Sequence, residues 1–532
     1  MGAAFTWAQN TNAPSGNSSP PTTASFPDSP TNITGTGFVP EQSINAPILS
    51  PLPPRTPLIH GPKIFGVRPG SPFLYTIPAT GDRPMTFSAQ GLPTGLTLDA
   101  ATGQITGTTQ QKGTFQVTFH AKNALGETNR PFKIVVGDEF VLTPPMGWNS
   151  WNCWGSSINQ DKILAAANAM VRTGLIQHGW SYVNVDDKWQ GSRGGEFNAI
   201  QSNPRAFPDF KGLADHVHAM GLKFGLYSTP WEKSYAGGVG GSAENPDGTT
   251  DKALMQTHPK QNEKILPLAI GPYHFFSNDA KQWGVWEVDY LKFDWAPNEV
   301  PETKEMEDAL SGSGRDIVLS LSNNTTNNLF DIIGDMSQIA NCWRICGDIG
   351  DHWTSILSHG FHQDKWAPFQ KPGHWNDPDM FQIGVAGGGK PKHLTPNEQY
   401  THVSMWCLLS APLLLGCDLD HLDNFTLGLM TNDEVIDVDQ DELGKQALNV
   451  SKNGDLEVYA KPMVDGSKAV GLFNLGPAEA AVTVKWSDLG VSGKQTVRDL
   501  WRQQDVGAFD DSYTAQVASH GVVLVRVIPA TP

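Results

Sequence analysis

The sequence is poor in cysteine and in basic residues. Only five of its 532 residues are cysteine, and no two of them form a Cys-x-x-Cys pair. This excludes the usual dithiol redox couple and the usual thiolate metal site, and no disulfide is required. Lysine and arginine total 37 against 54 aspartates and glutamates. Because binding to nucleic acid or anionic lipid depends on an excess of cationic side chains, nucleic acid is not expected as a partner.

Long apolar runs are also missing. No stretch of 18 apolar residues occurs, so no membrane span is expected. The first residues, Met1-Gly2-Ala3-Ala4, lack the basic and apolar regions of a signal peptide, and we expect that the N-terminus has been trimmed. The length predicts two to four domains, and a hydrophobic content of 39% is enough to give each a core.

The local pattern divides the chain into four parts. Residues 1–58 are rich in Ser, Thr, Pro, Asn and Gly, which predicts a flexible or extended leader. Residues 59–138 show short alternating runs between turn residues and predict a small β-sandwich. In residues 140–432 helical patterns alternate with short apolar strands, as in a (β/α)8 TIM barrel. Residues 433–532 return to alternating strands, which predicts a C-terminal antiparallel β-sandwich.

One motif in the first sandwich resembles a known module. Gly91-Leu92-Pro93-Thr94-Gly95 and Thr102-Gly103-Gln104-Ile105-Thr106-Gly107 closely resemble the immunoglobulin-like domains attached to bacterial surface and secreted enzymes. The resemblance implies a secreted or periplasmic location. The module shows no aromatic cluster, so we expect a spacer rather than a sugar binder.

Polar groups end six of the strands expected in the barrel. The carboxyl ends of all strands in such a barrel meet on one face, so these groups are expected to share one pocket. The strands are expected at 182–187, 224–228, 290–294, 317–322, 343–348 and 375–380. Helices are expected at 161–173, 211–220 and 396–409, the last opening with the capping box Thr395-Pro396-Asn397-Glu398.

The expected pocket holds carboxylates, cations and tryptophans, which suits the binding of a sugar. Its carboxylates are Asp186, Asp187, Asp294, Asp348, Asp377 and Asp379. Cleaving a glycosidic bond needs two carboxyls, one ionised and one protonated, for which we select Asp294 and Asp348. Lys292 stands two residues before Asp294 on the same strand face, and its charge is expected to keep Asp294 ionised. Arg344 stands four residues before Asp348, also in phase on a strand.

Each of these patterns has an ordinary alternative. Lys292 and Asp294 could be a structural ion pair, and the two acidic pairs could form turns, cap helices or bind a hard metal ion. Cations in the same pocket argue against the metal. Trp151 and Trp154 could be core residues.

Six motifs in order resemble the signatures of glycoside hydrolase family 27, which contains α-galactosidases and α-N-acetylgalactosaminidases. They are Thr143-Pro144-Pro145-Met146-Gly147-Trp148-Asn149-Ser150-Trp151, Asn184-Val185-Asp186-Asp187-Lys188-Trp189, Gly225-Leu226-Tyr227-Ser228, Asp289-Tyr290-Leu291-Lys292-Phe293-Asp294, Cys342-Trp343-Arg344-Ile345-Cys346-Gly347-Asp348-Ile349 and Gly373-His374-Trp375-Asn376-Asp377-Pro378-Asp379-Met380.

The resemblance implies a retaining double displacement, with Asp294 as nucleophile and Asp348 first as acid and then as base. It implies that Asp186 and Asp187 bind the 4-OH and 6-OH of galactose. For the other substrate-binding positions it implies that Lys292 and Arg344 bind further hydroxyls, that Trp151 and Tyr227 shape the pocket, and that Asp379 and Met380 close it. No metal or organic cofactor is implied, and the partner implied is a galactose-containing oligosaccharide or polysaccharide.

Three departures from the family pattern stand out. Lys188 and Ala296 replace two usual cysteines, and the loop that supplies a partner cysteine reads Ser234-Tyr235-Ala236. A disulfide is therefore lost as a pair, and we expect packing to take its role. Leu321-Ser322-Asn323 replaces the Cys-Glu-Trp of α-galactosidases, so Ser322 is expected near the sugar 2-position.

Hydrolysis of terminal α-D-galactosyl residues is the leading interpretation. The alternatives are α-N-acetylgalactosaminidase, which Ser322 resembles, β-L-arabinopyranosidase, against which the retained Asp187 argues, and a non-catalytic carbohydrate-binding protein. Both catalytic aspartates are present, which argues against the last.

Overall fold

The computed structural model of the protein describes residues 46–250, 269–322 and 326–530. Its centre is a sheet of eight parallel strands. In spatial order they are β20 (Trp375–Asp377), β19 (Cys342–Arg344), β18 (Val318–Ser322), β17 (Tyr290–Asp294), β14 (Lys223–Ser228), β11 (Tyr182–Asn184), β10 (Met146–Asn149) and β23 (Leu413–Leu415). The Phe381 backbone N–H donates to the Leu414 carbonyl at 2.8 Å. This contact joins the two edges, so the sheet closes into the predicted TIM barrel.

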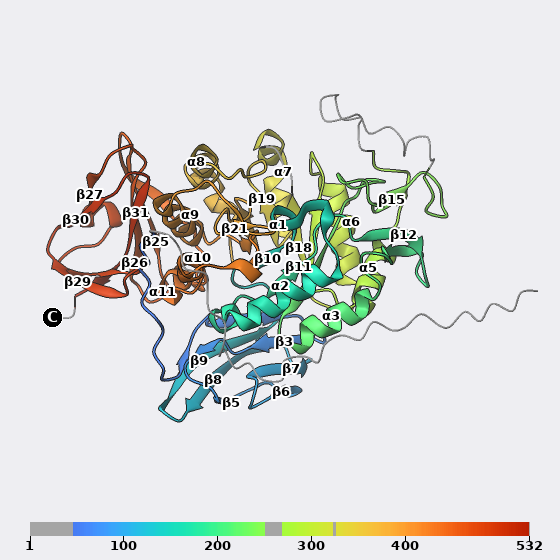
Figure 1. Cartoon of the computed structure of the whole chain (residues 1–532), viewed down its shortest axis with the longest axis horizontal. Coiled ribbons are helices and arrows are strands. Elements are labelled where there is room, and N and C mark those ends of the chain that lie inside the picture. The colour runs from blue at the N-terminus through green and yellow to red at the C-terminus, as the bar shows by residue number, and fades with distance from the viewer. Residues whose placement is uncertain (1–45, 251–268, 323–325, 531–532) are drawn as a thin grey trace, which may run out of the picture.

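Helices surround the barrel (Figure 1). They are α1 (Trp151–Trp154), α2 (Gln160–Arg172), α3 (Phe210–Ala219), α5 (Phe276–Val285), α6 (Val300–Ser311), α7 (Thr326–Ile339), α8 (Trp353–Gly360), α9 (Pro396–Leu409), α10 (Asn424–Met430) and α11 (Asp433–Asp439). The three predicted helices are α2, α3 and α9, each within one residue of its expected bounds. The capping box of α9 forms as predicted, with Thr395 and Glu398 each accepting from the other's backbone N–H. Among the described residues no helix is long and apolar enough to cross a bilayer.

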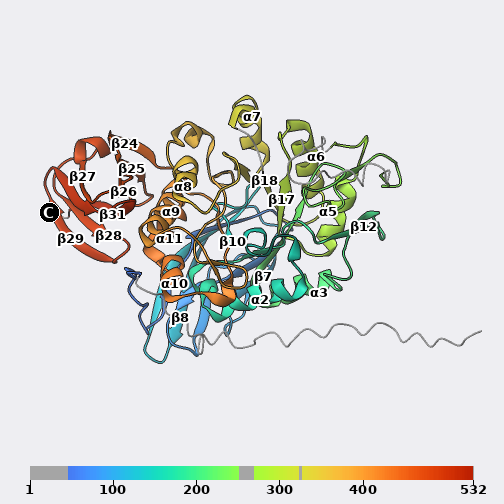
Figure 2. The ribbon, with the colours of Figure 1, turned by 45° about the horizontal axis from the view of Figure 1, so that its top comes forward.

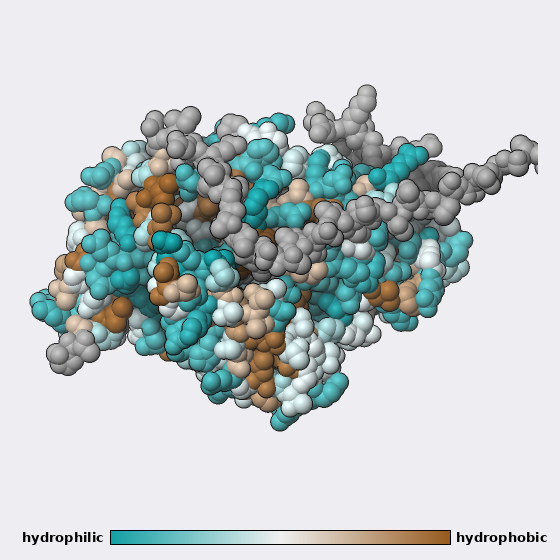
Figure 3. Space-filling model, turned by 60° about the horizontal axis from the view of Figure 1, so that its bottom comes forward, coloured by the Kyte–Doolittle hydropathy of each residue, from teal (hydrophilic) through white to brown (hydrophobic). Residues whose placement is uncertain are grey.

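The N-terminal module is a two-sheet sandwich of the predicted immunoglobulin-like kind. One sheet is ordered β2 (Ile64–Val67), β9 (Gly126–Val136), β8 (Gly113–Asn123), β5 (Thr86–Gln90), and the other β3 (Pro72–Thr76), β7 (Gln104–Thr108), β6 (Leu96–Leu98). A short pair, β1 (Leu58–Ile59) and β4 (Ala79–Thr80), lies beside them. Phe119 and Phe132 meet in the core with ring centroids 4.5 Å apart. Viewed from this side, the surface is mostly hydrophilic, with apolar residues in separate groups (Figure 3).

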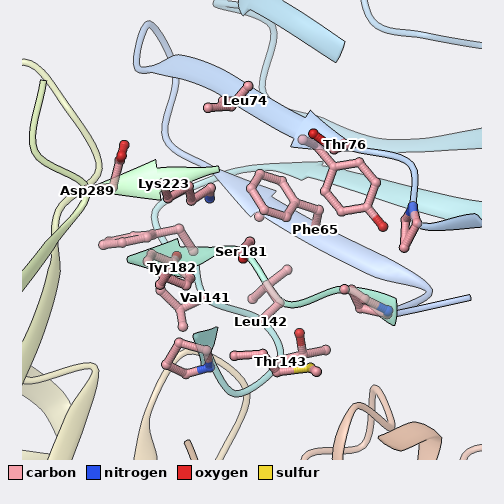
Figure 4. Close-up of a pocket in the computed structure, with 18 of the residues that line it drawn as sticks. Phe65, Leu74, Thr76, Val141, Leu142, Thr143, Ser181, Tyr182, Lys223 and Asp289 are labelled. Carbon is pink, nitrogen blue, oxygen red and sulfur yellow. The ribbon is translucent and has the colours of Figure 1, made fainter. Parts of the chain in front are cut away.

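The sandwich covers the end of the barrel where the strands begin. A cavity of about 100 Å³ remains between the two, lined by Phe65 of the sandwich and by Tyr182 and Lys223 at the starts of β11 and β14 (Figure 4). The Lys223 ammonium lies 4.5 Å from the Phe65 ring centroid and 5.2 Å from that of Tyr182. The two rings therefore stabilise a partly buried cation by cation–π contacts. This cavity is at the opposite end of the barrel from the predicted pocket.

The C-terminal part is an antiparallel β-domain, as predicted (Figure 2). Its large sheet is ordered β24 (Leu448–Asn453), β25 (Leu456–Pro462), β26 (Lys468–Asn474), β31 (Gly521–Pro529), β28 (Gln495–Asp499), β29 (Gln504–Phe509), and β27 (Ala480–Lys485) pairs with β30 (Ser512–Val517). Helix α9 lies between this sheet and the barrel and is buried on nearly every face. Helix α11 follows residue 432, where the barrel was expected to end, and packs on α9.

Most of the expected leader, residues 1–45, lies outside the described residues. The part that is described is extended and held against the barrel. The Tyr400 hydroxyl donates to the Pro47 carbonyl and accepts from the Leu49 N–H, both at 2.9 Å. The Ser50 hydroxyl donates to the Gly428 carbonyl at 2.8 Å. Residues 47–50 thus pack on α9 and α10.

Candidate active site

A buried acidic pair follows β11. Asp186 and Asp187 are each 2% exposed, although they come directly after a strand rather than within a helix or strand. Asp186 Oδ2 accepts from Lys292 Nζ and from Asn149 Nδ2, both at 2.9 Å. The Ser150 hydroxyl accepts from the Asp186 N–H at 2.9 Å. Strands β10, β11 and β17 together therefore fix this carboxylate.

Asp294 ends β17 and is buried at 4% exposure. Burial raises its pKa to about 7, against the opposing charge of Lys292 and with a further increase from Asp186. Its Oδ1 atom is buried and has no hydrogen-bond partner within the described part of the chain. A buried carboxylate oxygen without a partner is available to a substrate.

The expected effect of Lys292 on Asp294 is present but outweighed: its charge lowers the pKa of Asp294, and burial raises that pKa more. Lys292 does lie on the same strand face as Asp294, but its hydrogen bond goes to Asp186. The loss of water around Asp294 outweighs the Lys292 charge, so the pKa of Asp294 rises rather than falls. The two carboxylates in turn raise the pKa of Lys292, which stays protonated.

Arg344, at the end of β19, connects several of the predicted residues. Its guanidinium lies 2.8 Å from Asp379 Oδ2 and 3.1 Å from Asp348 Oδ1. It also lies 3.5 Å from the Ser322 hydroxyl of β18. Arg344 is 3% exposed, and the surrounding carboxylates raise its pKa despite burial. The buried Arg344 side chain therefore contacts Asp348, Asp379 and Ser322, three of the predicted site residues.

Asp348 is not on a strand. Its spacing of four residues from Arg344 had predicted that both lie on the same strand, and this prediction is wrong. Strand β19 ends at Arg344, whose register partner on β20 is Asp377. Beyond it the chain turns, and the Gly347 carbonyl accepts hydrogen bonds from Arg344 and His359. The Asp348 side chain is 75% exposed. The turn, and not a shared strand, brings the Asp348 side chain to Arg344.

Asp377 ends β20, and Asp379 follows it into the site, while Met380 donates its backbone N–H to Asp379 Oδ1 at 2.8 Å. Asp377 Oδ1 accepts from the Asp379 N–H at 2.7 Å, and burial raises the pKa of Asp377 to about 6. Asp379 has a backbone φ of +82°, a conformation rare for residues other than glycine. The Trp406 indole N–H donates to its carbonyl at 2.7 Å, and the Ile349 N–H donates to its carboxylate at 2.9 Å. These bonds hold the strained turn.

Aromatic residues form part of the walls. Tyr227 of β14 is 1% exposed, and the Lys292 ammonium lies 5.6 Å from its ring centroid. Burial, followed by the charge of Asp294, raises the pKa of Tyr227. Trp151 is partly buried at the start of α1, and its backbone N–H donates to Asn149 Oδ1 at 2.9 Å. Asn149 thus orients both Trp151 and Asp186. It received no role from the sequence, although its place at the end of β10 was a usable signal.

Hydrogen bonds join Lys188 and Asp187 to Ala236, in the loop where the resemblance implied the loss of a disulfide. The Lys188 ammonium donates to the Ala236 carbonyl at 2.6 Å. The Ala236 N–H donates to Asp187 Oδ2 at 2.8 Å. All five cysteines are buried free thiols.

Ser322 lies in the site beside Asp294. It is the register partner of Asp294 across β17 and β18, and it is buried at 4% exposure. Its carbonyl accepts from the Asn298 side chain at 3.2 Å. Asn323, the last residue of the Leu321-Ser322-Asn323 motif, lies outside the described residues.

A closed parallel barrel with aspartates, a lysine and an arginine gathered at the carboxyl ends of its strands is the architecture of a glycoside hydrolase. The family model "Alpha galactosidase A" matches residues 143–251 and 266–441. The model for the α-galactosidase C-terminal β-sandwich matches residues 453–527, and an Ig domain model matches residues 56–137. The chain belongs to the α-galactosidase family.

Individual relatives agree with this. Alpha-galactosidase 2 of Arabidopsis thaliana is 36% identical over 395 residues, covering 73% of this chain and 90% of the relative. A crystal structure from Bacteroides fragilis covers 90% of this chain and 98% of its own at 30% identity, with a TM-score of 0.78. A β-L-arabinopyranosidase from Geobacillus stearothermophilus is 28% identical, covers 73% of this chain and 97% of its own, and has a TM-score of 0.61.

Proposed function

We propose that the chain is a retaining exo-glycosidase that hydrolyses terminal α-D-galactosyl residues of oligosaccharides or polysaccharides. The observation that carries the proposal is the unequal placement of the two catalytic carboxylates. Asp294 is buried at the end of β17 with an unpartnered oxygen among the described residues, whereas Asp348 is 75% exposed. This suits a terminal sugar in an enclosed pocket with its leaving group toward solvent.

The reaction proceeds in two displacements at the anomeric carbon. In the first, Asp294 attacks that carbon while the glycosidic C–O bond breaks and Asp348 gives its proton to the leaving oxygen. In the second, water attacks the same carbon, gives a proton to Asp348 and releases Asp294. Attack neutralises the Asp294 charge, and the burial that raises the pKa of this carboxyl to about 7 disfavours the charged state that is lost.

The remaining residues bind the sugar in this proposal. Asp186, already fixed by Lys292 and Asn149, accepts from the 4-OH, and Asp187 accepts from the 6-OH. Lys292 and Arg344 donate to further hydroxyls. The pocket walls and closure come from Trp151, Tyr227, Ser322, Asp379 and Met380.

Ser322 supports a second candidate, α-N-acetylgalactosaminidase. Its small side chain stands at the register position of Asp294, where the resemblance gives α-galactosidases a glutamate near the 2-OH. The structural similarity to a β-L-arabinopyranosidase supports a third, which the buried Asp187 disfavours because a pentose has no 6-OH. For all three, we propose action outside the cytoplasm, on the strength of the immunoglobulin-like module.

The test is parallel hydrolysis of the 4-nitrophenyl α-galactoside, α-N-acetylgalactosaminide and β-L-arabinopyranoside. The proposal requires the highest kcat/KM for the first, with the α-anomer of galactose as the initial product by NMR. A higher value for either of the other two glycosides, or initial release of the β-anomer, contradicts it.

A further inference from the structure

A tight loop lies against the acidic pair of the site. Residues 233–239 reverse direction, with an isolated antiparallel bridge between Lys233 and Val239. Inside the bridge the Ser234 N–H donates to the Gly238 carbonyl at 3.0 Å, and the Gly238 N–H donates to the Ser234 hydroxyl at 2.7 Å. Ser234 is fully buried. The loop therefore has a defined shape of its own, with Ala236 near its tip.

Both peptide groups of Ala236 are bound by consecutive residues after β11. Its N–H donates to Asp187 Oδ2 at 2.8 Å, and its carbonyl accepts from Lys188 Nζ at 2.6 Å. The Lys188 backbone N–H closes the arrangement by donating to Asp187 Oδ1 at 2.7 Å and to Gln190 Oε1 at 2.9 Å. Asp187 thus has three donors, the Ala236 and Lys188 N–H groups and the Ser234 hydroxyl, and a carboxylate can accept about four hydrogen bonds.

The Lys188 ammonium adds a further link between the loop and the segment after β11. If it is lost, the Ala236 carbonyl has no other side-chain donor among the described contacts, and the loop keeps its Ala236 N–H and Ser234 hydroxyl bonds to Asp187. Asp187 is then held by a loop with one anchor fewer. Lys188 also has a φ of +92°, so the backbone there already adopts an unusual conformation to direct the side chain to the loop.

We propose that Lys188 is a positioning residue that fixes the Asp187 carboxylate, through Ala236, for recognition of the sugar's exocyclic CH2OH group. The inference rests on the proposed function, in which Asp187 accepts from the 6-OH. It predicts that Lys188 governs discrimination between a hexoside and the corresponding pentoside, because a pentopyranoside lacks that hydroxyl and gains nothing from a fixed Asp187.

The experiment measures kcat and KM of wild type, Lys188→Met, Lys188→Arg and the surface control Lys485→Met with the α-galactoside and the β-L-arabinopyranoside. In Lys188→Met the ratio of the two kcat/KM values falls about tenfold, mainly through a higher KM for the galactoside. Lys188→Arg retains a donor and most of the ratio, and Lys485→Met retains all of it. The three variants and wild type are compared by circular dichroism to establish that each is folded.

The outcomes separate the two proposals. A wild-type preference for the galactoside with an unchanged ratio in Lys188→Met overturns the role of Lys188 and leaves the proposed function standing. An equal loss for both glycosides in Lys188→Met also overturns it, since it points to general damage. Failure of wild type to prefer the galactoside overturns the proposed function and this inference with it.

Discussion

Lys292 forms its ion pair with Asp186, with Nζ 2.9 Å from Oδ2, rather than with Asp294 two residues away on the same strand. Two buried carboxylates therefore share the influence of one cation, and only one is bonded to it. Asp294 is left with a pKa raised to about 7 and a free oxygen among the described contacts. In the proposed function, this relationship gives the two acids separate roles, with Asp186 held for binding and Asp294 left to react with the substrate.

Replacement of Asp294 by alanine tests the nucleophile. We expect kcat to fall by roughly 10⁴-fold or more, because the covalent step is lost. Added azide should restore turnover of an activated α-galactoside by entering the space left by the carboxylate, and the product should be the azide of inverted configuration, identified by NMR. The control is Asp510→Ala, at an exposed position of the C-terminal domain. Undiminished turnover in Asp294→Ala would show that another group attacks.

The raised pKa of Asp294 also predicts a pH-dependent stability. The fold favours the neutral carboxyl of Asp294, so the ionised carboxylate lowers the stability of the folded state. This cost is absent below the unfolded pKa of about 4 and complete above a pH of about 7. Asp294→Asn removes this cost. We expect a Tm above that of wild type at pH 8 and a difference that shrinks toward zero at pH 4. Asp510→Asn should show no such trend. A Tm difference between Asp294→Asn and wild type that grows as the pH falls would contradict the prediction.

Lys292→Met should shift the acid limb of the pH dependence of kcat/KM. Asp294 must be ionised to attack, so kcat/KM of wild type should fall as the pH drops through about 7. The Lys292 charge lowers the pKa of Asp294, and its removal raises that pKa further, shifting the limb to higher pH. Lys292→Arg keeps the charge and should keep the limb. A limb unmoved in Lys292→Met would mean that another group sets it.

The sequence predicted most of the architecture because strand ends and helix caps are local signals. The alternation that ends in Asp294 and the capping box at Thr395 both formed as expected. Asp348 was placed on a strand because spacing alone cannot show where a ladder ends; the turn depends on the Arg344 bond to the Gly347 carbonyl. The Lys188 contact with Ala236 joins residues 48 apart through a backbone carbonyl, which no side-chain pattern records.

The attachment of the immunoglobulin-like module predicts a stability effect far from the pocket. Arg68 donates from Nε to Asp316 Oδ1 at 2.6 Å, from its backbone N–H to Oδ2 at 2.9 Å, and to the Ser311 hydroxyl and the Arg315 carbonyl, both at 2.8 Å. Asp316 is only 12% exposed. Removing the guanidinium takes one donor from Asp316, which keeps the Arg68 N–H and the Ser71 hydroxyl, and leaves the Arg315 carbonyl without its Arg68 donor, which costs about 2 kcal/mol.

Arg68→Ala should therefore lower the thermal unfolding midpoint while kcat/KM at 25 °C stays near that of wild type, because the contact lies at the end of the barrel opposite the site. Arg55→Ala is the matched control, since Arg55 pairs with Asp82 within the same module and is 79% exposed. Its midpoint should equal that of wild type. Equal midpoints for Arg68→Ala and Arg55→Ala would mean that the interface between module and barrel does not depend on this cluster, and that the apolar contacts around Phe65 and Tyr182 carry it instead.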